Sequence, residues 1–270
     1  MAVLKSIEGE GFSLHHSYDK APRDTDFPPH IHENYELFCL VNGEVDYMVE
    51  GNLYSLSGGS VIIMRSGETH KLVVNKSTEY ERYVLSFSPS ILSKIGISDE
   101  LLAPFRKRAL GEKNMYKESE LGLISPILYF EKMLSEAKIV GTQNAVLSSL
   151  ASLICSINAA FYEKDEPILQ KNNIEREIIS YINENLSKEI KIEDVAAHVH
   201  ISASHLCRIF KRATGTSVYN FITAKRLVLY SRNRKKGMGV IEASRKSGFS
   251  DYSAFYRLYK KRFGICPQER

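Results

Sequence analysis

Apolar and polar positions alternate in short runs over residues 30–87, where Val, Ile, Tyr and Phe are frequent and turn residues separate the runs. The turn pairs Asn42-Gly43 and Gly51-Asn52 fall between such runs. Pairs of this kind form the tight turns that join antiparallel strands, and several short strands at this spacing are typical of sandwiches and barrels. The pattern therefore predicts an antiparallel β-barrel or sandwich in the first part of the chain.

From residue 90 the apolar spacing lengthens to the period of an α-helix, most clearly in ISPILYFEKML and AVLSSLASLICSINAAFY. The second stretch, Ala145–Tyr162, is apolar nearly all round, so we expect it to be buried in the domain or in a dimer interface. We therefore predict a helical segment within residues 91–163 that serves dimerisation in a homodimer. The N-terminal domain is expected to span residues 1–163.

The C-terminal third of the chain contains an internal repeat. KIEDVAAHVHISASHLCRIFKRATG ends at Gly215, and GVIEASRKSGFSDYSAFYRLYKKRFG ends at Gly264. Each copy predicts a short helix, a tight turn and a longer helix, which together make a helix-turn-helix unit. The stretch SVYNFITAKRLVLYSRNRKK between the copies predicts one connecting helix. Aligned on the two glycines, the copies match Leu206 with Phe255, Arg208 with Arg257, Ile209 with Leu258, Phe210 with Tyr259 and Lys211 with Lys260.

The formal net charge of +4 conceals an asymmetry between the two halves of the chain. Residues 174–270 carry 19 Lys and Arg against 9 Asp and Glu, whereas residues 1–173 carry 17 against 23. A basic domain attracts a polyanion, so double-stranded DNA is the first candidate partner of the C-terminal half. The polar stretch EKDEPILQKNN, residues 163–173, lies where the charge changes sign. We predict the linker there and a DNA-binding domain over residues 174–270.

The longer helix of each unit is expected to present one face to the core and the other to solvent. Leu206, Ile209 and Phe210 share one face in the first copy, which leaves Arg208 on the other. A single basic helix is more often a solvated face, but arginine at the matching outward position of two copies favours reading of the DNA major groove. The predicted DNA-binding residues are Ser202, Ala203, Ser204, Cys207, Arg208, Lys211, Arg212, Asp251, Tyr252, Ser253, Tyr256, Arg257 and Lys260.

The segments AxxxxISASHLCRIFKRATG and GFSDYSAFYRLYKKRFGICP resemble the C-terminal domain of the AraC/XylS family of bacterial transcriptional regulators. The resemblance covers roughly residues 174–270. It implies two helix-turn-helix units that read DNA sequence, and a regulator rather than an enzyme. Ala243, Ser244 and Ser247 are smaller or more polar than is usual in the family, and the closing PQER lacks the usual tyrosine before the arginine. These departures predict a second unit that packs less tightly than the first.

Three histidines and a glutamate in the predicted barrel have the spacing of a ligand set. His30 and His32 project to the same face of a strand, Glu36 shares their parity, and His70 follows on a neighbouring strand. Three neutral imidazoles and a carboxylate suit zinc, nickel, iron or manganese. The same side chains can instead hydrogen-bond a polar ligand such as a sugar, or line the barrel mouth without binding anything. All three interpretations stay open at this point.

This spacing is similar to the first motif of the cupin fold, and GSVIIMRSGETH is similar to the second, with Arg65 where proline is usual. Sensor domains of the AraC family resemble this fold, whose barrel holds a small effector. The resemblance implies an α+β chain, in which a cupin-like N-terminal β-barrel with a helical segment precedes an all-α domain. We expect effector contacts from His30, His32, Tyr35, Glu36, Phe38, Arg65, His70 and Tyr83, and any divalent transition metal on His30, His32, Glu36 and His70.

No apolar run approaches the length of about 18 residues that a membrane span needs, and the N-terminus lacks the apolar core of a signal peptide. The four cysteines are far apart and form no C-x-x-C pair. We therefore expect a cytoplasmic transcriptional activator that contacts double-stranded DNA, RNA polymerase and a small polar effector such as a sugar, but no membrane. Two alternatives stay open: a metal-dependent cupin enzyme fused to a DNA-binding domain, and a protein that coats DNA without sequence preference.

Overall fold

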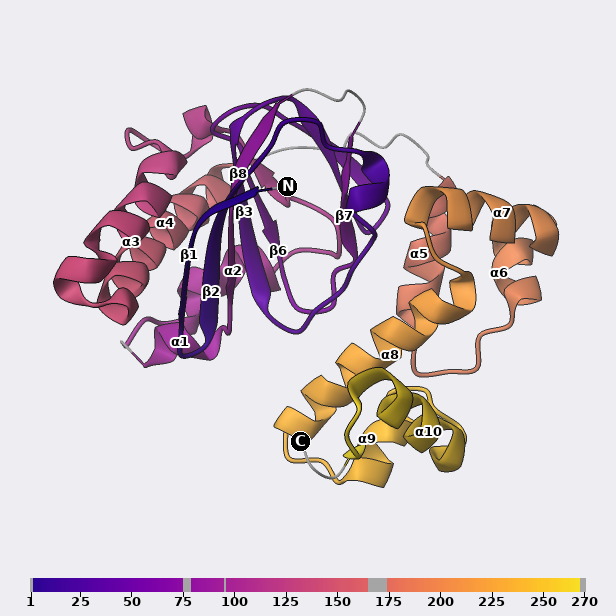
Figure 1. Ribbon diagram of the computed structural model, residues 1–270. Helices are drawn as coiled ribbons and strands as arrows, with labels where there is room; N and C mark the ends of the chain where they lie inside the picture. Colours follow the sequence, from indigo (N-terminus) through magenta and orange to yellow (C-terminus); the bar gives the residue numbers. More distant parts are fainter. Residues whose placement is uncertain (1, 75–78, 95, 165–173, 268–270) are drawn as a thin grey trace. The chain divides into compact units, whose positions relative to one another are not determined.

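The computed structural model describes residues 2–74, 79–94, 96–164 and 174–267 (Figure 1). The chain divides into two compact units, an N-terminal one of residues 1–30 and 34–170, and a C-terminal one of residues 171–270 with which residues 31–33 are grouped. The predicted linker, residues 163–173, lies outside the described residues except for Glu163 and Lys164.

The N-terminal unit contains two antiparallel sheets. The larger has the strand order β1-β2-β8-β3-β6-β9, made by β1 (Ala2–Gly9), β2 (Phe12–Asp19), β8 (Tyr80–Phe87), β3 (Tyr35–Asn42), β6 (Val61–Met64) and β9 (Met115–Tyr116). The smaller has the order β5-β4-β7, made by β5 (Asn52–Leu56), β4 (Val45–Val49) and β7 (His70–Val73). This unit and the helical C-terminal unit confirm the predicted fold class, an antiparallel β domain followed by an all-α domain.

Strand β3 lies between two apolar cores. Its sequence YELFCLVN is apolar on both faces, and all but its last two residues are buried. Leu37 and Cys39 belong to the core shared with the helices of this unit, whereas Phe38 and Leu40 belong to the core shared with the smaller sheet. Successive side chains on a strand point to opposite faces, so the even-numbered residues of β3 face the space between the two sheets.

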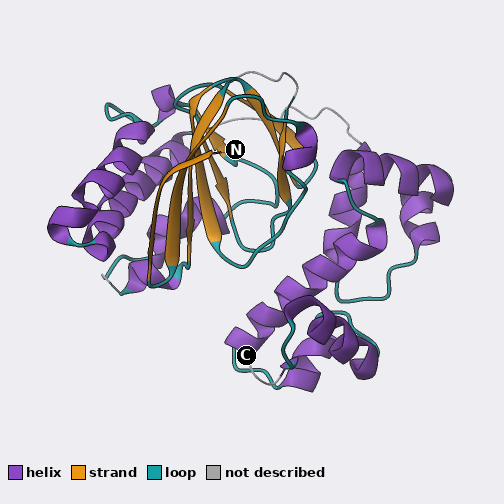
Figure 2. Ribbon diagram, viewed as in Figure 1, coloured by secondary structure: helices purple, strands orange, loops and turns teal. Residues whose placement is uncertain are grey.

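Helices cover one face of the larger sheet, as Figure 2 shows for the two longest of this unit, α3 (Pro126–Val140) and α4 (Thr142–Glu163). The apolar helix α4 packs Val146, Leu150 and Ile154 into the core of its own unit, which confirms the first of the two predicted modes of burial. The shorter helices are α1 (Ser90–Ser93), α2 (Ala103–Arg106) and the 3-10 helices η1 (Asp24–Asp26), η2 (Asp99–Leu102) and η3 (Glu118–Glu120).

Helix α4 corrects one prediction from the sequence. By length and composition it is able to span a membrane, with a mean hydropathy of 1.6 over 18 residues, so the expectation that no stretch reaches this limit is wrong. Serines interrupt the apolar residues of this helix, and the stretch therefore does not stand out as an unbroken apolar run. Packing accounts for the composition, because 56% of that window is buried inside the unit.

The C-terminal unit contains the duplication that the sequence predicts. Helices α6 (Ile192–His198) and α9 (Val240–Lys246) have seven residues each, and helices α7 (Ala203–Thr214) and α10 (Tyr252–Phe263) have twelve each. Both longer helices end at a glycine in the left-handed conformation, Gly215 and Gly264, which confirms the alignment of the copies on these residues. Helix α5 (Ile174–Asn185) precedes the first copy, and the single helix α8 (Val218–Lys235) connects the two, as predicted.

Each copy has its own small core. Leu206 and Phe210 of α7 pack with residues of α5 and α6, and Phe255 and Tyr259 of α10 pack with Tyr230 of α8. The small polar residues of the second copy are buried but hydrogen-bonded. The Ser247 hydroxyl donates to the Ala243 carbonyl oxygen at 2.7 Å and accepts from the Asn233 side-chain amide at 3.0 Å, and the Ser244 hydroxyl donates to the Ile241 carbonyl oxygen at 2.8 Å. Paired hydroxyls of this kind remove most of the cost of burying polar groups.

Candidate ligand cavity and nucleic-acid interface

A cavity of about 280 Å³ lies between the two sheets of the N-terminal unit. Strands β3, β4, β7 and β8 supply most of its wall, and the segment around η1 supplies the rest. Aromatic and aliphatic side chains alternate there with a few polar ones, which is the usual composition of a small-molecule site. The lining residues are Asp26, Phe27, Pro28, His30, Glu36, Phe38, Tyr47, Leu72, Tyr80, Arg82 and Val84.

Glu36 is the buried acid of this cavity, with 6% of its surface exposed. The Tyr47 hydroxyl lies 3.5 Å from Glu36 Oε1, and His70 Nε2 lies 3.7 Å from the same oxygen. Burial, and after it the charge of Glu36, raises the pKa of Tyr47 well above its ordinary value, so the phenol stays protonated and donates toward the carboxylate. The site therefore presents a buried carboxylate with a protonated phenol beside one of its oxygens.

His70 is held in one orientation. Its Nδ1 lies 2.9 Å from the Glu68 carbonyl oxygen, and a carbonyl only accepts, so Nδ1 carries the proton. In the neutral ring Nε2 then has the lone pair, directed to the side where Glu36 lies. A histidine fixed through one ring nitrogen in this way is the common arrangement of a metal ligand.

The predicted ligand set comes together in the structure. The ligand atoms of His30, His32, Glu36 and His70 all lie within 4.8 Å of one another. The His30 and His70 rings approach with centroids 4.1 Å apart, and the backbones of these two residues form an isolated antiparallel bridge. Imidazole nitrogens and a carboxylate oxygen at this spacing fit a divalent transition metal, and they equally fit a polar organic ligand.

Four effector residues predicted from the sequence are therefore part of the cluster, and a fifth, Phe38, lines the cavity. The structure does not bring the other three to it. Tyr35 stacks on Phe105 at 4.7 Å and Tyr83 stacks on Phe130 at 5.2 Å, both in the helix-covered core on the opposite face of the sheet. Arg65 Nη1 instead donates to the Phe105 carbonyl oxygen at 3.2 Å.

Arg82, Tyr80 and Tyr47 line the cavity but were not predicted from the sequence. Arg82 directly precedes the predicted Tyr83 along β8, so the two side chains point to opposite faces of the sheet. A signal for Arg82 was present, since it is a charged residue within the otherwise largely apolar strand sequence YERYVLSF. Phe27, which also lines the cavity, belongs to an irregular segment for which the sequence offers no periodic signal.

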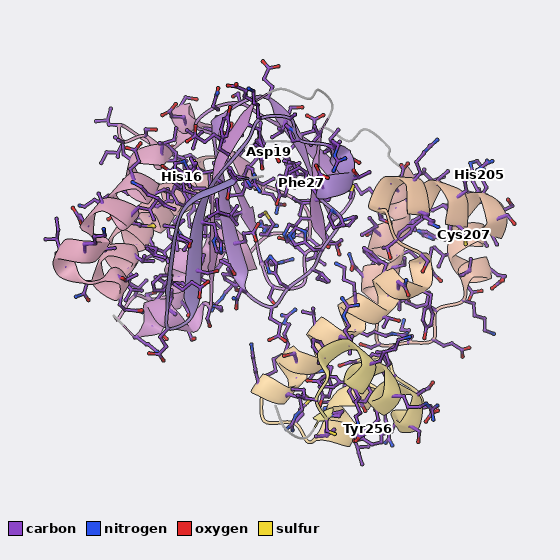
Figure 3. All side chains as sticks on the ribbon, in the orientation of Figure 1. His16, Asp19, Phe27, His205, Cys207 and Tyr256 are labelled. Carbon is purple, nitrogen blue, oxygen red and sulfur yellow. The ribbon has the colours of Figure 1, made fainter. Side chains whose placement is uncertain are left out.

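The first helix-turn-helix unit exposes the predicted face of α7. The Ser202 hydroxyl accepts from the His205 backbone N–H at 3.3 Å and caps the helix. All the predicted residues of this copy are exposed except Ala203, which is half-buried. His205 was not predicted, yet it is exposed at the start of the same helix, and Figure 3 labels it with Cys207.

The second unit also exposes a polar face. The Asp251 carboxylate accepts from the Ser253 backbone N–H at 2.8 Å, and Ser253, Arg257 and Lys260 are exposed. Tyr252 and Tyr256 are half-buried. The Tyr252 ring lies 5.9 Å from that of Phe255, and the Tyr256 hydroxyl, labelled in Figure 3, lies 2.9 Å from Cys266 Sγ. These contacts leave the two tyrosines partly available to a partner.

Backbone contacts join the two helix-turn-helix units to each other. Arg226 of α8 donates from Nε to the Leu186 carbonyl oxygen at 2.9 Å and from Nη2 to the Lys188 carbonyl oxygen at 2.6 Å. Gly248, in the turn of the second unit, also packs against Leu186. A Cβ added to Gly248 would lie 2.1 Å from the Leu186 carbonyl oxygen. The two units are therefore held in one arrangement by more than the connecting helix.

We expect Gly248→Ala to destabilise the C-terminal unit by about 2–4 kcal/mol, through its positive φ and through the clash with Leu186. Gly237→Ala is the matched control, since Gly237 has a similar φ of +86° but nothing within 4 Å of an added Cβ. It should cost only about 1 kcal/mol. Urea unfolding of the full chain, followed by helical circular dichroism, measures both, and equal losses in the two variants would contradict the tight contact.

Two family models match the chain. The one described as AraC-like ligand binding domain matches residues 18–120, and the one described as Helix-turn-helix domain matches residues 195–269. The first range contains the cavity and the ligand cluster, and the second contains both candidate DNA-reading helices.

Curated relatives span most of the chain at low identity. The regulator YfiF of Bacillus subtilis, described as an uncharacterized HTH-type transcriptional regulator, is 25% identical over 88% of this chain and 76% of its own length. The Msm operon regulatory protein of Streptococcus mutans is 20% identical over 94% and 90%, and the HTH-type transcriptional activator RhaS of Escherichia coli is 22% identical over 90% and 87%. Among solved structures, ToxT from Vibrio cholerae matches 97% of both chains with 13% identity and a TM-score of 0.40.

A β domain with an internal cavity, joined to a helical domain with two helix-turn-helix units, defines a DNA-binding transcriptional regulator with a sensor domain. The chain belongs to the AraC family of transcriptional regulators.

Proposed function

We propose that this regulator is an activator that responds to a small polar effector, with a sugar as the first candidate, bound in the cavity between the two sheets. The observation that carries this proposal is the set of polar groups, including His30 and Glu36, on an otherwise aromatic and aliphatic wall. Its relative RhaS is described as a transcriptional activator, which supports the same sign of regulation here. Activation in the cytoplasm implies RNA polymerase as a further partner.

The proposed DNA contacts follow from the two exposed helix faces. Arg208 and Arg257 occupy matching positions near the middle of α7 and α10, where a guanidinium is able to reach guanine in the major groove. Lys211, Arg212 and Lys260 come later in these helices and suit phosphates, which position the protein without reading sequence. Helix α8 has 18 residues and is therefore about 27 Å long, which suits two reading helices in adjacent major-groove turns.

The effector acts, in this proposal, by favouring one of two states of the regulator. Binding shifts such an equilibrium only if the effector has a different affinity for each state. The proposed states differ in the dimer formed through the helical segment 91–163, or in the orientations open to the DNA-binding domain over residues 174–270.

Glu36→Gln tests the proposed effector site. The substitution keeps the shape of the side chain but removes the charge and an acceptor, so we expect the response to effector to fall at least tenfold. A reporter fused to the regulated promoter, assayed across a panel of sugars and related compounds, measures this response. Asp46→Asn is the control, because Asp46 is a half-buried carboxylate on β4 that lies outside the cavity. A full response from Glu36→Gln would contradict the proposal, provided that DNA affinity without effector is unchanged.

A second candidate function rests on the ligand cluster. His30, His32, Glu36 and His70 would hold a divalent transition metal, which supplies Lewis-acid chemistry when bound, as in a cupin enzyme. The relatives are regulators, which does not favour this candidate. Elemental analysis of the purified chain decides between the two. We expect effector binding to survive treatment with a chelator, whereas stoichiometric metal and turnover of a substrate would support the enzyme.

A further inference from the structure

Arg82 gives the cavity a property that neutral-sugar binding does not require. Its exposed fraction is 7%, and it lies on the cavity wall. Its guanidinium carbon lies 4.6 Å from the ring centroid of Tyr80 and 5.4 Å from that of Phe27. These are cation–π distances to two rings that stand at 86° to each other, and they hold the guanidinium in the cavity wall. Five N–H donors allow the group to bind a protein acceptor and a ligand at the same time.

Two acids line the cavity with Arg82, and a third, Asp19, is buried on β2, where it pairs in register with Tyr80. Asp26, the acid nearest in sequence to Phe27, forms an ion pair with Arg23 at 2.8 Å. Glu36 lies elsewhere on the wall. It pairs with Ser86 of β8, whereas Arg82, four residues before Ser86 on the same strand, pairs with Leu40 of β3. Four residues of a strand correspond to about 13 Å between Cα atoms. The cavity wall thus has a cationic part at Arg82 and an acidic part at Glu36, and both charges act on Tyr47 and Tyr80.

An apolar floor separates these two parts. Phe38 and Val84 pair across β3 and β8 between the Glu36 and Arg82 positions, and the Phe38 ring lies 4.9 Å from that of Tyr47. The carbon-bound face of a sugar ring, or an aromatic ring, packs well on such a surface. The volume of about 280 Å³ is near the lower limit of ligand pockets, which favours a molecule of about monosaccharide size.

We propose that the effector is a small hydroxylated carboxylic acid, such as a sugar acid or a hydroxybenzoate, whose carboxylate pairs with Arg82 and whose hydroxyl donates to Glu36. This proposal rests on the proposed effector function of the same cavity and specifies its ligand. A guanidinium matches a carboxylate through two parallel hydrogen bonds, which are stronger than those between neutral groups. A neutral sugar offers the acidic part of the cavity the same hydroxyl but leaves Arg82 without an anion from the ligand.

Calorimetric titration of the full chain with two matched pairs of probes tests this class of ligand. The pairs are sodium glucuronate with glucose, and sodium 4-hydroxybenzoate with 4-hydroxybenzyl alcohol. Each acid differs from its neutral partner chiefly in the carboxylate. We expect at least one acid to bind about tenfold or more tightly than its neutral partner. The pair that shows the difference tells a sugar acid from an aromatic acid.

Three variants show whether Arg82 causes the preference. Arg82→Gln should lower affinity for the acid by about tenfold or more and leave the neutral partner unchanged, and Arg82→Lys should give an intermediate loss because it keeps the charge but not the paired geometry. Arg65→Gln, which removes a cation from outside the cavity, should bind like the wild type. Unchanged thermal unfolding establishes that each variant is folded, and the Arg82→Lys result stands if Arg82→Gln is unstable.

The inference is overturned if neither acid binds at millimolar concentration, if the neutral partners bind as well as the acids, or if Arg82→Gln retains the preference. These outcomes concern only the chemical class of the ligand and do not contradict the proposal that the cavity binds an effector. Neutral sugars that bind wild type but not Glu36→Gln would support an effector cavity of a different chemical class.

Discussion

Arg208→Ala and Arg257→Ala are each expected to weaken binding of the full chain to its operator by about 1–3 kcal/mol and to relax base preference at one position. The two residues belong to separate helix-turn-helix units with separate cores, so the losses in the double variant should add to about 2–6 kcal/mol. Fluorescence anisotropy with a labelled operator measures this at a fixed salt concentration, because affinity for DNA depends strongly on salt.

Lysine variants distinguish recognition of DNA bases from electrostatic attraction to the DNA backbone. Arg208→Lys and Arg257→Lys keep the positive charge but lose the planar fork that pairs with guanine. We expect them to bind scrambled DNA like the wild type and to lose much of the preference for the operator. Operator binding that is equal in the wild type and in both alanine variants would show that α7 and α10 do not read the bases.

Arg108→Met is expected to lower the free energy of unfolding of the N-terminal unit by about 3–5 kcal/mol. Arg108 forms two charge-assisted hydrogen bonds to Glu68, at 2.5 Å and 2.7 Å, and both side chains are almost fully buried. The Asn114 amide also donates to Glu68 at 3.2 Å. Removing the cation leaves a buried carboxylate that only weaker hydrogen-bond donors and the Arg65 guanidinium, 3.8 Å away, compensate. Urea unfolding at pH 7 measures the loss, and Glu68→Leu combined with Arg108→Met should recover much of it.

The same ion pair predicts how stability depends on pH. Burial alone would raise the pKa of Glu68, but the charge and hydrogen bonds of Arg108 outweigh it and lower that pKa below its ordinary value of 4.5. The wild type therefore has the full contribution of this pair above about pH 4.5 and loses it as pH falls through the lowered pKa. In Arg108→Met burial dominates and the pKa rises, so the difference in stability between wild type and variant should narrow between pH 7 and pH 5. A constant difference would argue against a charged Glu68.

The helix-turn-helix units could be predicted from the sequence because local signals define them. A capping side chain, an apolar stripe and a terminal glycine fix each helix within a dozen residues, and the structure has Ser202, Asp251, Gly215 and Gly264 in those roles. The duplication added a second, independent constraint on the alignment. What the sequence lacked was any sign of the Arg226 contacts, which join residues 38 and 40 positions apart.

The cavity was predicted only in part, because the wall depends on which face of each strand turns inward. Strand β3 is apolar on both faces, so its alternation does not distinguish Glu36 and Phe38, which face the cavity, from Tyr35, which does not. The same ambiguity on β8 led to Tyr83 instead of Arg82. Motif spacing gave His70 correctly as part of the ligand cluster, since that inference did not depend on strand parity.

The most direct test of the central claim, that both helix-turn-helix units read one DNA duplex, uses the duplex that the full chain selects from a random pool. The chain should bind the selected duplex about 10³-fold or more tightly than a scrambled duplex. A 5-bp insertion between the two half-sites should remove most of this preference, because it rotates one half-site by about half a turn relative to the other. Equal affinity for the selected, scrambled and inserted duplexes at moderate salt would contradict the account.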